Sequence, residues 1–416
     1  MVLPAIIFDL DMTLLDTSAL LPARNAGNWG YVWRNLGLAR PFVVDPPQPA
    51  PHEIPGILRG LGHPVAIVTS SPRNYAEALL TQFNVPYDQL VAAGDTTRYK
   101  PDPEPLEKAL ELLGVAPADA YYVGDAKEDF EASYHAGIKS IGAGWNPEVE
   151  GLWKTAPDIL LYHPGFLQRP QLLARTGYVA EVLAAGLTPF IHWGSVLRCD
   201  SPTRVALGRY FPSKDARYAK HPLTNRVLEL KDSDGPSALF GTAVANYVKI
   251  MQPQPFYATC VPPKPQVARI RFAQTLQFMQ QQVSGVSIVP DGLYATREVK
   301  DYKKANYDQR RKLIAGAYAS KYNNWDSKHV LLLDDVLTSG ATMDECADVL
   351  LANKAGSVHT ISLSVDQHAS ARVCPRPECD GRLSLKPNRR YGTHFWGCSR
   401  WKKDKTGCNY TEDYIP

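Results

Sequence analysis

Long hydrophobic runs are missing from this sequence, including from its start. The first segment, MVLPAIIFDL, is apolar for only a few residues before an acidic position interrupts it. A membrane helix needs about 20 apolar residues, and a secretory leader has a longer apolar centre than this. We therefore expect neither a signal peptide nor a membrane span, and we expect a cytoplasmic protein.

The sequence also has little net charge. Its 45 Lys and Arg residues nearly balance 42 Asp and Glu residues, which leaves a formal net charge of +3. The chain as a whole therefore gives no reason to expect non-specific binding of polyanions, and any basic surface has to be local. With 44% hydrophobic and 21% charged residues, the composition is that of a soluble globular protein. A length of 416 residues predicts about three domains.

Cysteine is scarce in most of the chain and crowded near its end. Three of the seven cysteines are scattered, and the other four lie in the last stretch: Cys374, Cys379, Cys398 and Cys408. Cytoplasmic thiols stay reduced, and a group of four near one terminus more often holds zinc than disulfides. We therefore predict a zinc site at these four cysteines.

One stretch, Val330–Leu350, combines a buried-strand pattern with an acidic pair, a loop of small residues and a helix start. The apolar run Val330–Leu333 leads into Asp334 and Asp335, so the predicted strand carries two acids at its carboxyl end. Open α/β sheets place their ligands at that edge. The small residues after it let backbone N–H groups and hydroxyls close on an anion at the helix N-terminus.

The segment LLLDDVLTSGAT resembles the phosphoribosyl pyrophosphate (PRPP) binding loop of type I phosphoribosyltransferases. The resemblance implies that the paired acids contact the ribose 2′- and 3′-hydroxyls and organise Mg²⁺, while the loop wraps the 5′-phosphate. It assigns these roles to Asp334, Asp335, Thr338, Ser339, Gly340, Ala341 and Thr342. An ordinary strand–turn–helix crossover with a polar loop is the alternative interpretation.

A second acidic strand end lies near the start of the chain. Ala5–Leu10 has the pattern of a buried strand and runs into Asp9 and Asp11. Two carboxylates separated by one residue can flank one phosphate. The first can attack phosphorus, and the second can exchange a proton with the leaving group and later with water.

FDLDMTLLDT closely resembles motif I of the haloacid dehalogenase (HAD) superfamily of phosphatases, and the other motifs follow in order. The strand Val65–Val68 ends at Thr69, whose hydroxyl can hold a phosphate oxygen. Lys100, in RYKPDPEP, matches the lysine that neutralises nucleophile and phosphate. The strand Ala120–Val123 ends in GDAKED, which matches the acidic motif that completes a Mg²⁺ site. Surface acids without a function are the alternative, but four ordered motifs at strand ends argue against them.

The HAD resemblance implies a role for each of these residues. Asp9 forms an aspartyl-phosphate, and Asp11 acts as general acid and base. Asp9, the backbone carbonyl of Asp11, and Asp125 hold Mg²⁺, while Asp129 orients the site and Lys100. Met12 stands where the family usually has glycine.

Motifs I and II are separated by an insert whose second half, Pro41–Pro55, is rich in proline and unsuited to a helical cap of normal size. We therefore expect a small cap and an open site, which suits a bulky phosphorylated substrate. The insert's aromatic residues either form a short lid over Asp9 or pack the insert onto the core: Trp29, Tyr31, Trp33 and Phe42.

The middle of the chain resembles in part the ComF-like branch of phosphoribosyltransferases. The strand Phe256–Val261 ends in a proline-rich turn, and a helix expected over Val267–Val283 begins with arginines. The resemblance implies that Lys264, together with Arg269 or Arg271, faces the pyrophosphate. The branch usually has glycine where this chain has Arg271.

A strongly basic segment follows, where that branch has a mobile hood over the ligand. The resemblance implies that Arg297, Arg310 or Arg311 reaches PRPP or the acceptor. The remaining basic residues of the segment are Lys300, Lys303, Lys304 and Lys312.

The cysteine-rich tail resembles the C-terminal zinc fingers of bacterial type IA topoisomerases, notably in CDGRL and FWGCSRW. Four thiolates suit tetrahedral zinc. His394 as a ligand is a further possibility that the pattern leaves open. Basic and aromatic residues interleave around the cysteines, which suits single-stranded nucleic acid, and a small ribbon core is the alternative. These residues are Arg389, Arg390, Tyr391, Phe395, Trp396, Arg400, Trp401, Lys402, Lys403 and Lys405.

We therefore expect an α/β protein with two doubly wound parallel-sheet domains, one HAD-like and one phosphoribosyltransferase-like, plus a small β zinc ribbon. The expected boundaries are 1–168, 169–370 and 371–416. The expected function is a bifunctional Mg²⁺-dependent phosphatase and PRPP-binding protein that acts on nucleotides or nucleic-acid ends. The alternative is a phosphatase with a non-catalytic PRPP or nucleotide sensor and a nucleic-acid-binding ribbon in DNA uptake, repair or stress response.

Overall fold

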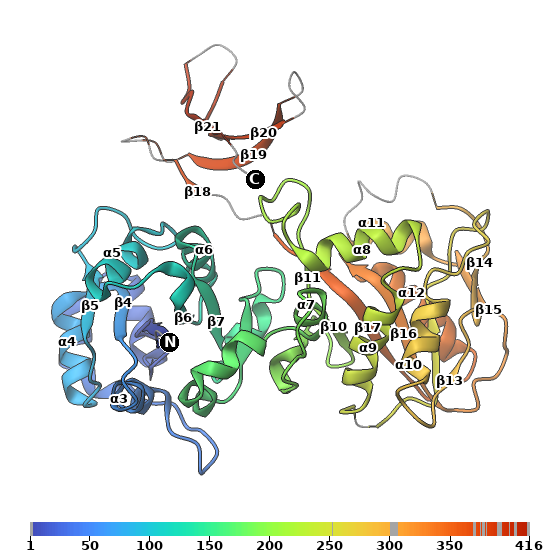
Figure 1. The fold of residues 1–416 in the computed structure, drawn as a ribbon, viewed down its shortest axis with the longest axis horizontal. Coiled ribbons are helices and arrows are strands. Elements are labelled where there is room, and N and C mark those ends of the chain that lie inside the picture. Colours follow the sequence, from blue (N-terminus) through green and yellow to red (C-terminus); the bar gives the residue numbers. More distant parts are fainter. Residues whose placement is uncertain are drawn as a thin grey trace. The chain divides into compact units, whose positions relative to one another are not determined.

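The computed structural model describes residues 3–251, 253–299, 307–368, 372–374, 376, 379, 381–388, 393–398, 400–402 and 406–413. The chain divides into two compact units, Met1–Ala174 with Ala369–Pro416, and Arg175–His368 (Figure 1). Some of the basic and aromatic residues singled out from the sequence lie outside the described residues: Lys300, Lys303, Lys304, Arg389, Arg390, Tyr391, Lys403 and Lys405.

The first unit is built on a six-stranded parallel sheet with the order β5-β4-β1-β6-β7-β8. Its strands are β1 (Ala5–Phe8), β4 (Val65–Pro72), β5 (Gln89–Ala93), β6 (Ala120–Gly124), β7 (Lys139–Ala143) and β8 (Ile159–Leu161). The helices that follow or precede them are α3 (Ile54–Gly60), α4 (Arg73–Gln82), α5 (Glu104–Leu113) and α6 (Lys127–Ala136).

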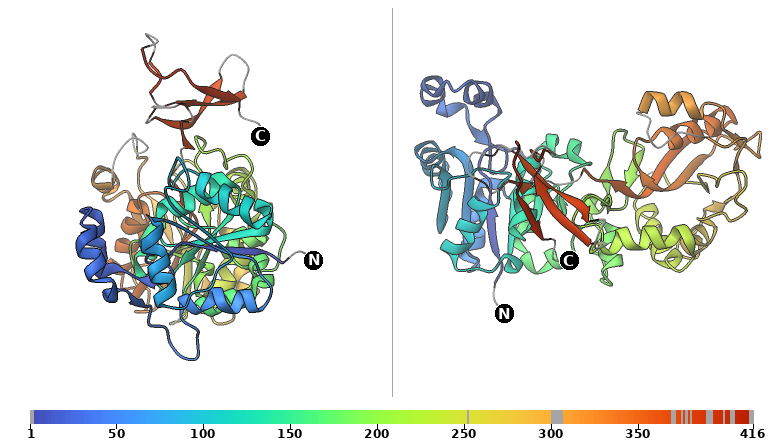
Figure 2. Two further views of the ribbon diagram at one scale, coloured as in Figure 1. Left: turned by 90° about the vertical axis from the view of Figure 1, so that its left-hand side faces the viewer. Right: turned by 90° about the horizontal axis from the view of Figure 1, so that it is seen from above.

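Both faces of this sheet are covered by helices (Figure 2). Alternate residues of a strand point to opposite faces, so Ile6 and Phe8 enter one hydrophobic core while Ala5 and Ile7 enter the other. The first core includes Tyr75 of α4, and the second includes residues of α5 and α6. Burial on both faces explains why β1 is a continuous apolar run.

The insert after β1 contains two short helices and a two-stranded ribbon. Its elements are β2 (Leu15–Asp16), α1 (Leu21–Asn25), α2 (Trp29–Arg34) and β3 (Arg40–Pro41). The Trp29 ring packs edge-to-face on Tyr75, with the ring centroids 5.6 Å apart, so this aromatic residue attaches the insert to the core. Tyr31 and Trp33 are both exposed.

The second unit has a seven-stranded sheet with the main order β13-β12-β16-β17-β10-β9, and β11 also pairs with β17. All these pairings are parallel except the one between β9 and β10. The strands are β9 (Leu197–Arg198), β10 (Arg204–Ala206), β11 (Arg209–Tyr210), β12 (Tyr257–Cys260), β13 (Ser287–Ile288), β16 (His329–Leu337) and β17 (Ser357–Asp366). A separate hairpin pairs β14 (Leu293–Ala295) with β15 (Tyr318–Ser320).

Helices cover this second sheet as well. They are α7 (Val179–Ala184), α8 (Pro222–Asp232), α9 (Ser237–Val248), α10 (Ala273–Gln280), α11 (Tyr307–Ile314) and α12 (Ala341–Ala352). Alternate residues of β16 again enter two cores. Leu331 and Leu333 pack with residues of α8, α9 and α10, whereas Val330 and Leu332 pack with residues of α12.

Two expectations about element bounds in this unit are wrong. The strand expected to end at Leu333 continues through the acidic pair to Leu337, because β17 offers it partners as far as Val365. The helix expected over Val267–Val283 covers only α10. The residues before α10 instead make a turn that buries Phe272 in the core.

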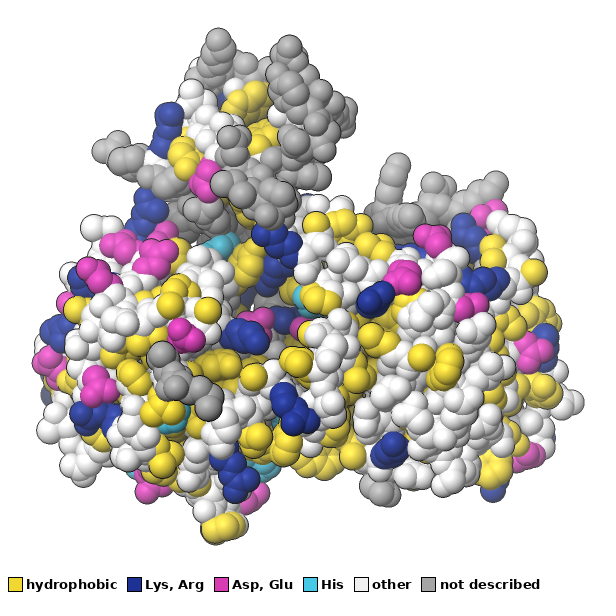
Figure 3. Space-filling view, in the orientation of Figure 1, with side chains coloured by type: hydrophobic (Ala, Val, Ile, Leu, Met, Phe, Trp, Pro, Cys, Tyr) yellow, Lys and Arg dark blue, Asp and Glu magenta, His cyan; other side chains and the backbone are white. Residues whose placement is uncertain are grey.

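The tail forms a four-stranded antiparallel sheet in chain order. Its strands are β18 (Arg372–Val373), β19 (Arg382–Asn388), β20 (Thr393–Cys398) and β21 (Thr411–Asp413). On the face drawn in Figure 3, the described acidic and basic side chains are interspersed, as the small net charge of the chain leads one to expect. None of the helices in the described part of the chain combines the length and apolar character that crossing a membrane requires.

Candidate active and ligand-binding sites

The sequence-predicted phosphatase residues gather at one edge of the first sheet. β1 lies between β4 and β6, and all three strands are parallel. Asp9 follows β1, Thr69 lies near the end of β4, and Asp125 follows β6, so the topology brings them to the same edge. In open α/β sheets this is the edge where ligands bind.

Lys100 connects the acids of this edge. Its Nζ donates to Asp9 Oδ1 at 2.7 Å, to Asp129 Oδ1 at 2.6 Å and to the Tyr122 hydroxyl at 2.8 Å. Burial lowers the pKa of Lys100, but the carboxylates of Asp129 and Asp9 outweigh burial, so the pKa lies well above its ordinary value. The ammonium is therefore a permanent charge that neutralises part of the acidic group.

The carboxylates of Asp9, Asp125 and Asp129 each place an oxygen within 4.8 Å of the others. Burial raises the pKa of Asp9 to about 7 and that of Asp125 to about 8, because three acids share one lysine away from bulk water. Buried carboxylate oxygens that exceed the nearby positive charge are the donor set that Mg²⁺ prefers. The residues present therefore fit a divalent cation.

Neighbouring groups fix the orientation of these carboxylates. Thr13 Oγ1 donates to Asp125 Oδ1 at 2.9 Å, and Asn146 Nδ2 donates to Asp125 Oδ2 at 3.1 Å. Asp129 Oδ2 accepts from the backbone N–H groups of Asp125 and Ala126 at the start of α6. No role was expected from the sequence for Thr13 or Asn146, although Asn146 follows the end of β7 and could have been found from its position.

Asp11 has different neighbours from Asp9. Its Oδ1 pairs with Arg24 Nη1 at 2.6 Å and accepts from the hydroxyls of Thr17 and Tyr75, while its Oδ2 accepts from Ser71 Oγ at 2.6 Å. Arg24 also donates to Ser71 Oγ at 2.8 Å. The insert helix α1 and the end of β4 thus hold the carboxylate of Asp11, and no local sequence pattern links residue 24 to residue 11.

Thr69 and Met12 also lie at this edge of the sheet. Thr69 is buried, and its Oγ1 accepts from the backbone N–H of Ser71 at 3.1 Å. Met12 has a φ of 62°, the left-handed conformation that glycine adopts most easily, at the position where the HAD family usually has glycine. The loop therefore keeps the glycine-type backbone, and the Met12 carbonyl accepts from Asn146 Nδ2 at 3.2 Å.

The predicted PRPP loop joins β16 to α12. Gly340 has a φ of 80°, and a Cβ at this position would lie 2.5 Å from Arg204 Nη1. Arg204 is buried on β10 and pairs with Asp200 at 2.8 Å and with Asp344 on α12. A side chain at residue 340 is thus strained by the backbone conformation, and it would force the Arg204 guanidinium to shift.

An arginine contacts the acidic pair of this loop, Asp334 and Asp335. Burial, and then the neighbouring Asp335, raises the pKa of Asp334 to about 8. The Arg271 guanidinium forms an ion pair with Asp335 Oδ2. The loop hydroxyls also meet a guanidinium, because Arg310 Nη1 of α11 donates to Thr338 Oγ1 at 3.0 Å and to Ser339 Oγ at 3.2 Å.

The other predicted PRPP residues make contacts elsewhere. Lys264 Nζ pairs with Glu298 at 3.2 Å, and Arg297 Nη2 donates to the carbonyls of Leu313 and Ala315. Arg269 pairs with Asp234 at 2.6 Å, and Arg311 pairs with Asp348 at 2.7 Å. Of the arginines proposed from the sequence, Arg271 and Arg310 are the two whose described contacts reach the residues assigned to PRPP.

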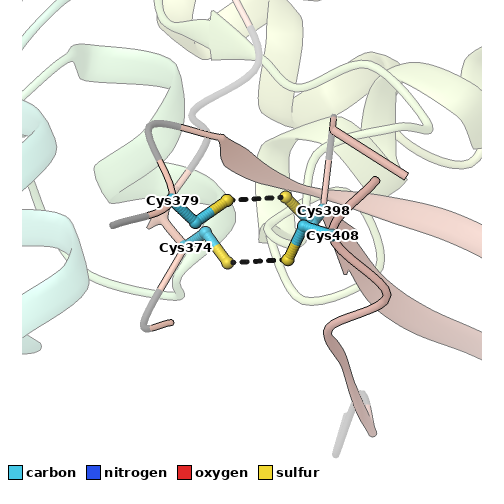
Figure 4. A group of neighbouring side chains, drawn as sticks. All are labelled: Cys374, Cys379, Cys398 and Cys408. Carbon is cyan, nitrogen blue, oxygen red and sulfur yellow. Dashed lines mark hydrogen bonds between the residues drawn. The ribbon is translucent and has the colours of Figure 1, made fainter. Parts of the chain in front are cut away.

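The four clustered cysteines converge in the tail (Figure 4). Their Sγ atoms lie within 4.8 Å of one another, and the pairs Cys374–Cys408 and Cys379–Cys398 are each 3.7 Å apart. A disulfide needs about 2.05 Å, whereas tetrahedral zinc with Zn–S bonds of about 2.3 Å separates its sulfur ligands by about 3.8 Å. The spacing therefore fits zinc, and all four cysteines are free thiols.

Comparisons with known protein families match two parts of the chain. The haloacid dehalogenase-like hydrolase family matches residues 52–143, and the phosphoribosyl transferase domain family matches residues 278–374. The second range includes the whole predicted PRPP loop. The first begins after motif I, so the roles of Asp9 and Asp11 rest on the motif and on the geometry described above.

Individual relatives resemble the first unit. Pyrophosphatase PpaX of Bacillus cereus (strain AH820) is 38% identical over 107 residues, which are 25% of this chain and 50% of that protein. Phosphoglycolate phosphatase of Aquifex aeolicus is 36% identical over 141 residues, 33% of this chain and 64% of that protein. The crystal structure of CbbY from Rhodobacter sphaeroides in complex with phosphate has 20% identity and a TM-score of 0.30, covering 40% of this chain and 96% of that one.

The chain spans about half the length of the pyrophosphatases that it matches, so the likeness concerns one part of each protein. The hydrolase match falls within the first sheet and its helices, and the transferase match falls largely on the second. The chain therefore contains a haloacid dehalogenase-like hydrolase domain and a phosphoribosyltransferase domain, together with a C-terminal cysteine cluster compatible with a zinc ribbon.

Proposed function

We propose that residues 1–168 act as a Mg²⁺-dependent phosphatase through an aspartyl-phosphate. The observation that carries the proposal is the group of Asp9, Asp125 and Asp129 around the Lys100 ammonium at the carboxyl end of β1. Mg²⁺ held by Asp9, Asp125 and the backbone carbonyl of Asp11 would supply positive charge to the phosphate oxygens.

The chain's own groups then divide the reaction into two displacements. A carboxylate oxygen of Asp9 attacks phosphorus, the bond from phosphorus to the leaving oxygen breaks, and Asp11 gives that oxygen a proton. In the second step Asp11 takes a proton from water, whose oxygen attacks phosphorus and releases phosphate from Asp9. Lys100 offsets the negative charge of Asp9 and the phosphate, and Thr69 binds a phosphate oxygen. Asp11 must carry a proton before the first step, which requires its ion pair with Arg24 to open.

The proposed substrates are nucleotides or phosphorylated nucleic-acid ends. The short insert helices α1 and α2 support this choice, since a small cap leaves room for a large leaving group. The names of the relatives, a pyrophosphatase and a phosphoglycolate phosphatase, make smaller phosphate compounds the second class to be tested.

We also propose that residues 169–370 bind PRPP. The loop from Thr338 to Thr342 supports binding of the 5′-phosphate, because it offers backbone N–H groups at the start of α12 and three hydroxyls, two of which contact the Arg310 guanidinium of α11. The unit either transfers the phosphoribosyl group to an acceptor or senses PRPP or a nucleotide without transfer, in DNA uptake, repair or stress response. Release of pyrophosphate separates the two.

For the tail we propose zinc at the four cysteines and contact with single-stranded nucleic acid. Arg400, Trp401 and Lys402 are exposed next to Cys398, which supports the nucleic-acid proposal because cations and an aromatic ring then face solvent together. Phosphates would pair with the cations, and a base would stack on the indole ring.

The first prediction concerns Asp9. Asp9→Asn removes the nucleophilic carboxylate, so the turnover number should fall by about 10³ or more in a screen of pyrophosphate, phosphoglycolate, nucleotides and phosphorylated DNA or RNA ends. Asp45→Asn, at an exposed acid of the insert, should leave turnover unchanged. Undiminished turnover in the Asp9 variant would show that the proposed mechanism is wrong.

The second prediction concerns the PRPP loop. Gly340→Val should weaken PRPP binding at least about tenfold in calorimetry, because the new side chain collides with Arg204. Gly285→Val is the matched control, since Gly285 also has a positive φ, 81°, but has no atom within 4 Å of the added Cβ. Equal binding by both variants would contradict the loop assignment. Pyrophosphate release on addition of candidate acceptors would favour transfer over sensing.

The third prediction concerns zinc. The purified chain should carry about one zinc ion, and Cys398→Ser should lower that content and destabilise the tail, because zinc binding supplies much of the folding energy of such small units. Metal analysis and proteolysis of the tail measure the two effects. Cys199→Ser, a scattered half-buried thiol, should change neither. Full zinc content in the Cys398 variant would exclude the four-cysteine site.

The fourth prediction concerns the tail's exposed indole. Trp401→Ala should weaken binding of a single-stranded oligonucleotide about fivefold or more, and wild-type affinity should fall as salt rises. Trp193→Ala, at a comparably exposed tryptophan of the second unit, is the control. If the wild-type chain binds without salt dependence, or if both variants bind alike, the ribbon is not a nucleic-acid surface.

A further inference from the structure

The acidic pair of the PRPP loop, Asp334 and Asp335, differs from the acidic group of the phosphatase site in how its negative charge is neutralised. Three of its four carboxylate oxygens already accept hydrogen bonds. Asp334 Oδ1 accepts from the backbone N–H of Asp335 at 2.8 Å, Asp335 Oδ1 accepts from that of Val336 at 2.7 Å, and Asp335 Oδ2 accepts from Arg271. The pair thus has one guanidinium for two carboxylates, whereas the phosphatase acids have one ammonium for three.

A divalent cation on Asp335 would lie beside the guanidinium of Arg271, which is always charged. The residues present therefore do not fit the Mg²⁺ that the resemblance to phosphoribosyltransferases implies.

Arg271 stands where the ComF-like branch usually has glycine, and its side chain is 35% exposed, so a ligand can reach part of it. A guanidinium offers several N–H donors in a fixed plane and binds phosphate in a bidentate manner. It can thus keep its contact with Asp335 and still donate to an incoming phosphate group.

A second guanidinium lies farther along the same loop. Arg310 contacts the hydroxyls of Thr338 and Ser339, and two neighbouring contacts attach its helix to α12. Tyr307 donates to Asp344 at 2.9 Å, and Arg311 pairs with Asp348. The loop therefore has one arginine at its acidic end and another at its hydroxyl end.

We propose that Arg271 takes the place of the divalent cation, so that this site binds a sugar carrying two phosphate-type groups, such as PRPP, without a metal ion. The proposal rests on the proposed PRPP function of the unit and narrows it. Arg271 neutralises one phosphate group beside Asp335, and Arg310 neutralises the other in the loop. Arg271 is thus the residue that sets the metal requirement.

The test measures PRPP affinity by calorimetry in EDTA and in Mg²⁺, using the full chain with Asp9→Asn so that the phosphatase site cannot consume the ligand. The affinity should agree within about threefold between the two buffers. Arg271→Ala should lower the affinity in EDTA about tenfold or more, since one charge-assisted contact to phosphate is lost. Part of the loss should return with Mg²⁺, because the freed carboxylate can then ligate it.

Two controls separate this effect from misfolding. Arg271→Lys keeps the charge and should retain most of the binding in EDTA. Arg226→Ala removes another arginine of an ion pair in the same unit, one that pairs with Glu229 at 2.8 Å, and should have no effect. The inference is wrong, but the proposed function is not, if the chain with Arg271 intact binds PRPP only in Mg²⁺. The same holds if the alanine and lysine variants lose equal PRPP affinity. Absence of PRPP binding in both buffers overturns the proposed function and the inference with it.

Discussion

The contact on which the first unit depends is the one between the Lys100 ammonium and two buried carboxylates. Bringing Asp9, Asp125 and Asp129 within 4.8 Å of one another away from water is unfavourable, because like charges repel and each carboxylate loses hydration. Lys100, with 7% of its side chain exposed, offsets the charge of Asp9 and Asp129 through bonds of 2.7 and 2.6 Å. One ammonium cannot balance three carboxylates, and the excess negative charge is what makes the group suited to a divalent cation.

The second unit also brings carboxylates close together, but with a different balance of positive and negative groups. Its acids also lie at the carboxyl end of a central parallel strand, where a phosphate ligand requires a cation. There are two acids rather than three, and an arginine pairs with one of them. The ratio of positive to negative groups is therefore higher than around Lys100. The two units thus share a sheet architecture but differ in how much positive charge a metal ion would have to supply.

The sequence predicted the parts of these sites that depend on strand ends, since a buried parallel strand is a continuous apolar run and its last residue fixes the position of the acids that follow. Asp9 and Asp125 were identified in this way, whereas the four cysteines were identified from their crowding near one end of the sequence. Arg24 was not, because its contact with Asp11 is made by an irregular insert with no periodicity. Strand length was also misjudged at β16: the pairing of Asp334 with Ser362 extends the strand beyond the polar residues, and such pairing is a tertiary effect. The same holds for Arg271, whose turn conformation ends the helical pattern expected there.

The positions of Arg271 and Arg310, the two arginines that contact the loop, also restrict the kind of ligand. A single phosphate needs one guanidinium at the helix N-terminus, and Arg310 supplies it beside Thr338 and Ser339. Arg271 lies at the other end of the loop, beside Asp335. A ligand that binds both arginines must therefore carry an anionic group at each end. Between these groups it must carry polar groups that can hydrogen-bond to the acids. A ribose with phosphate groups at both ends has that order of charges, whereas a free base or a monophosphate leaves one arginine facing only its own carboxylate. The charge pattern of the loop thus favours a sugar bisphosphate over either of them.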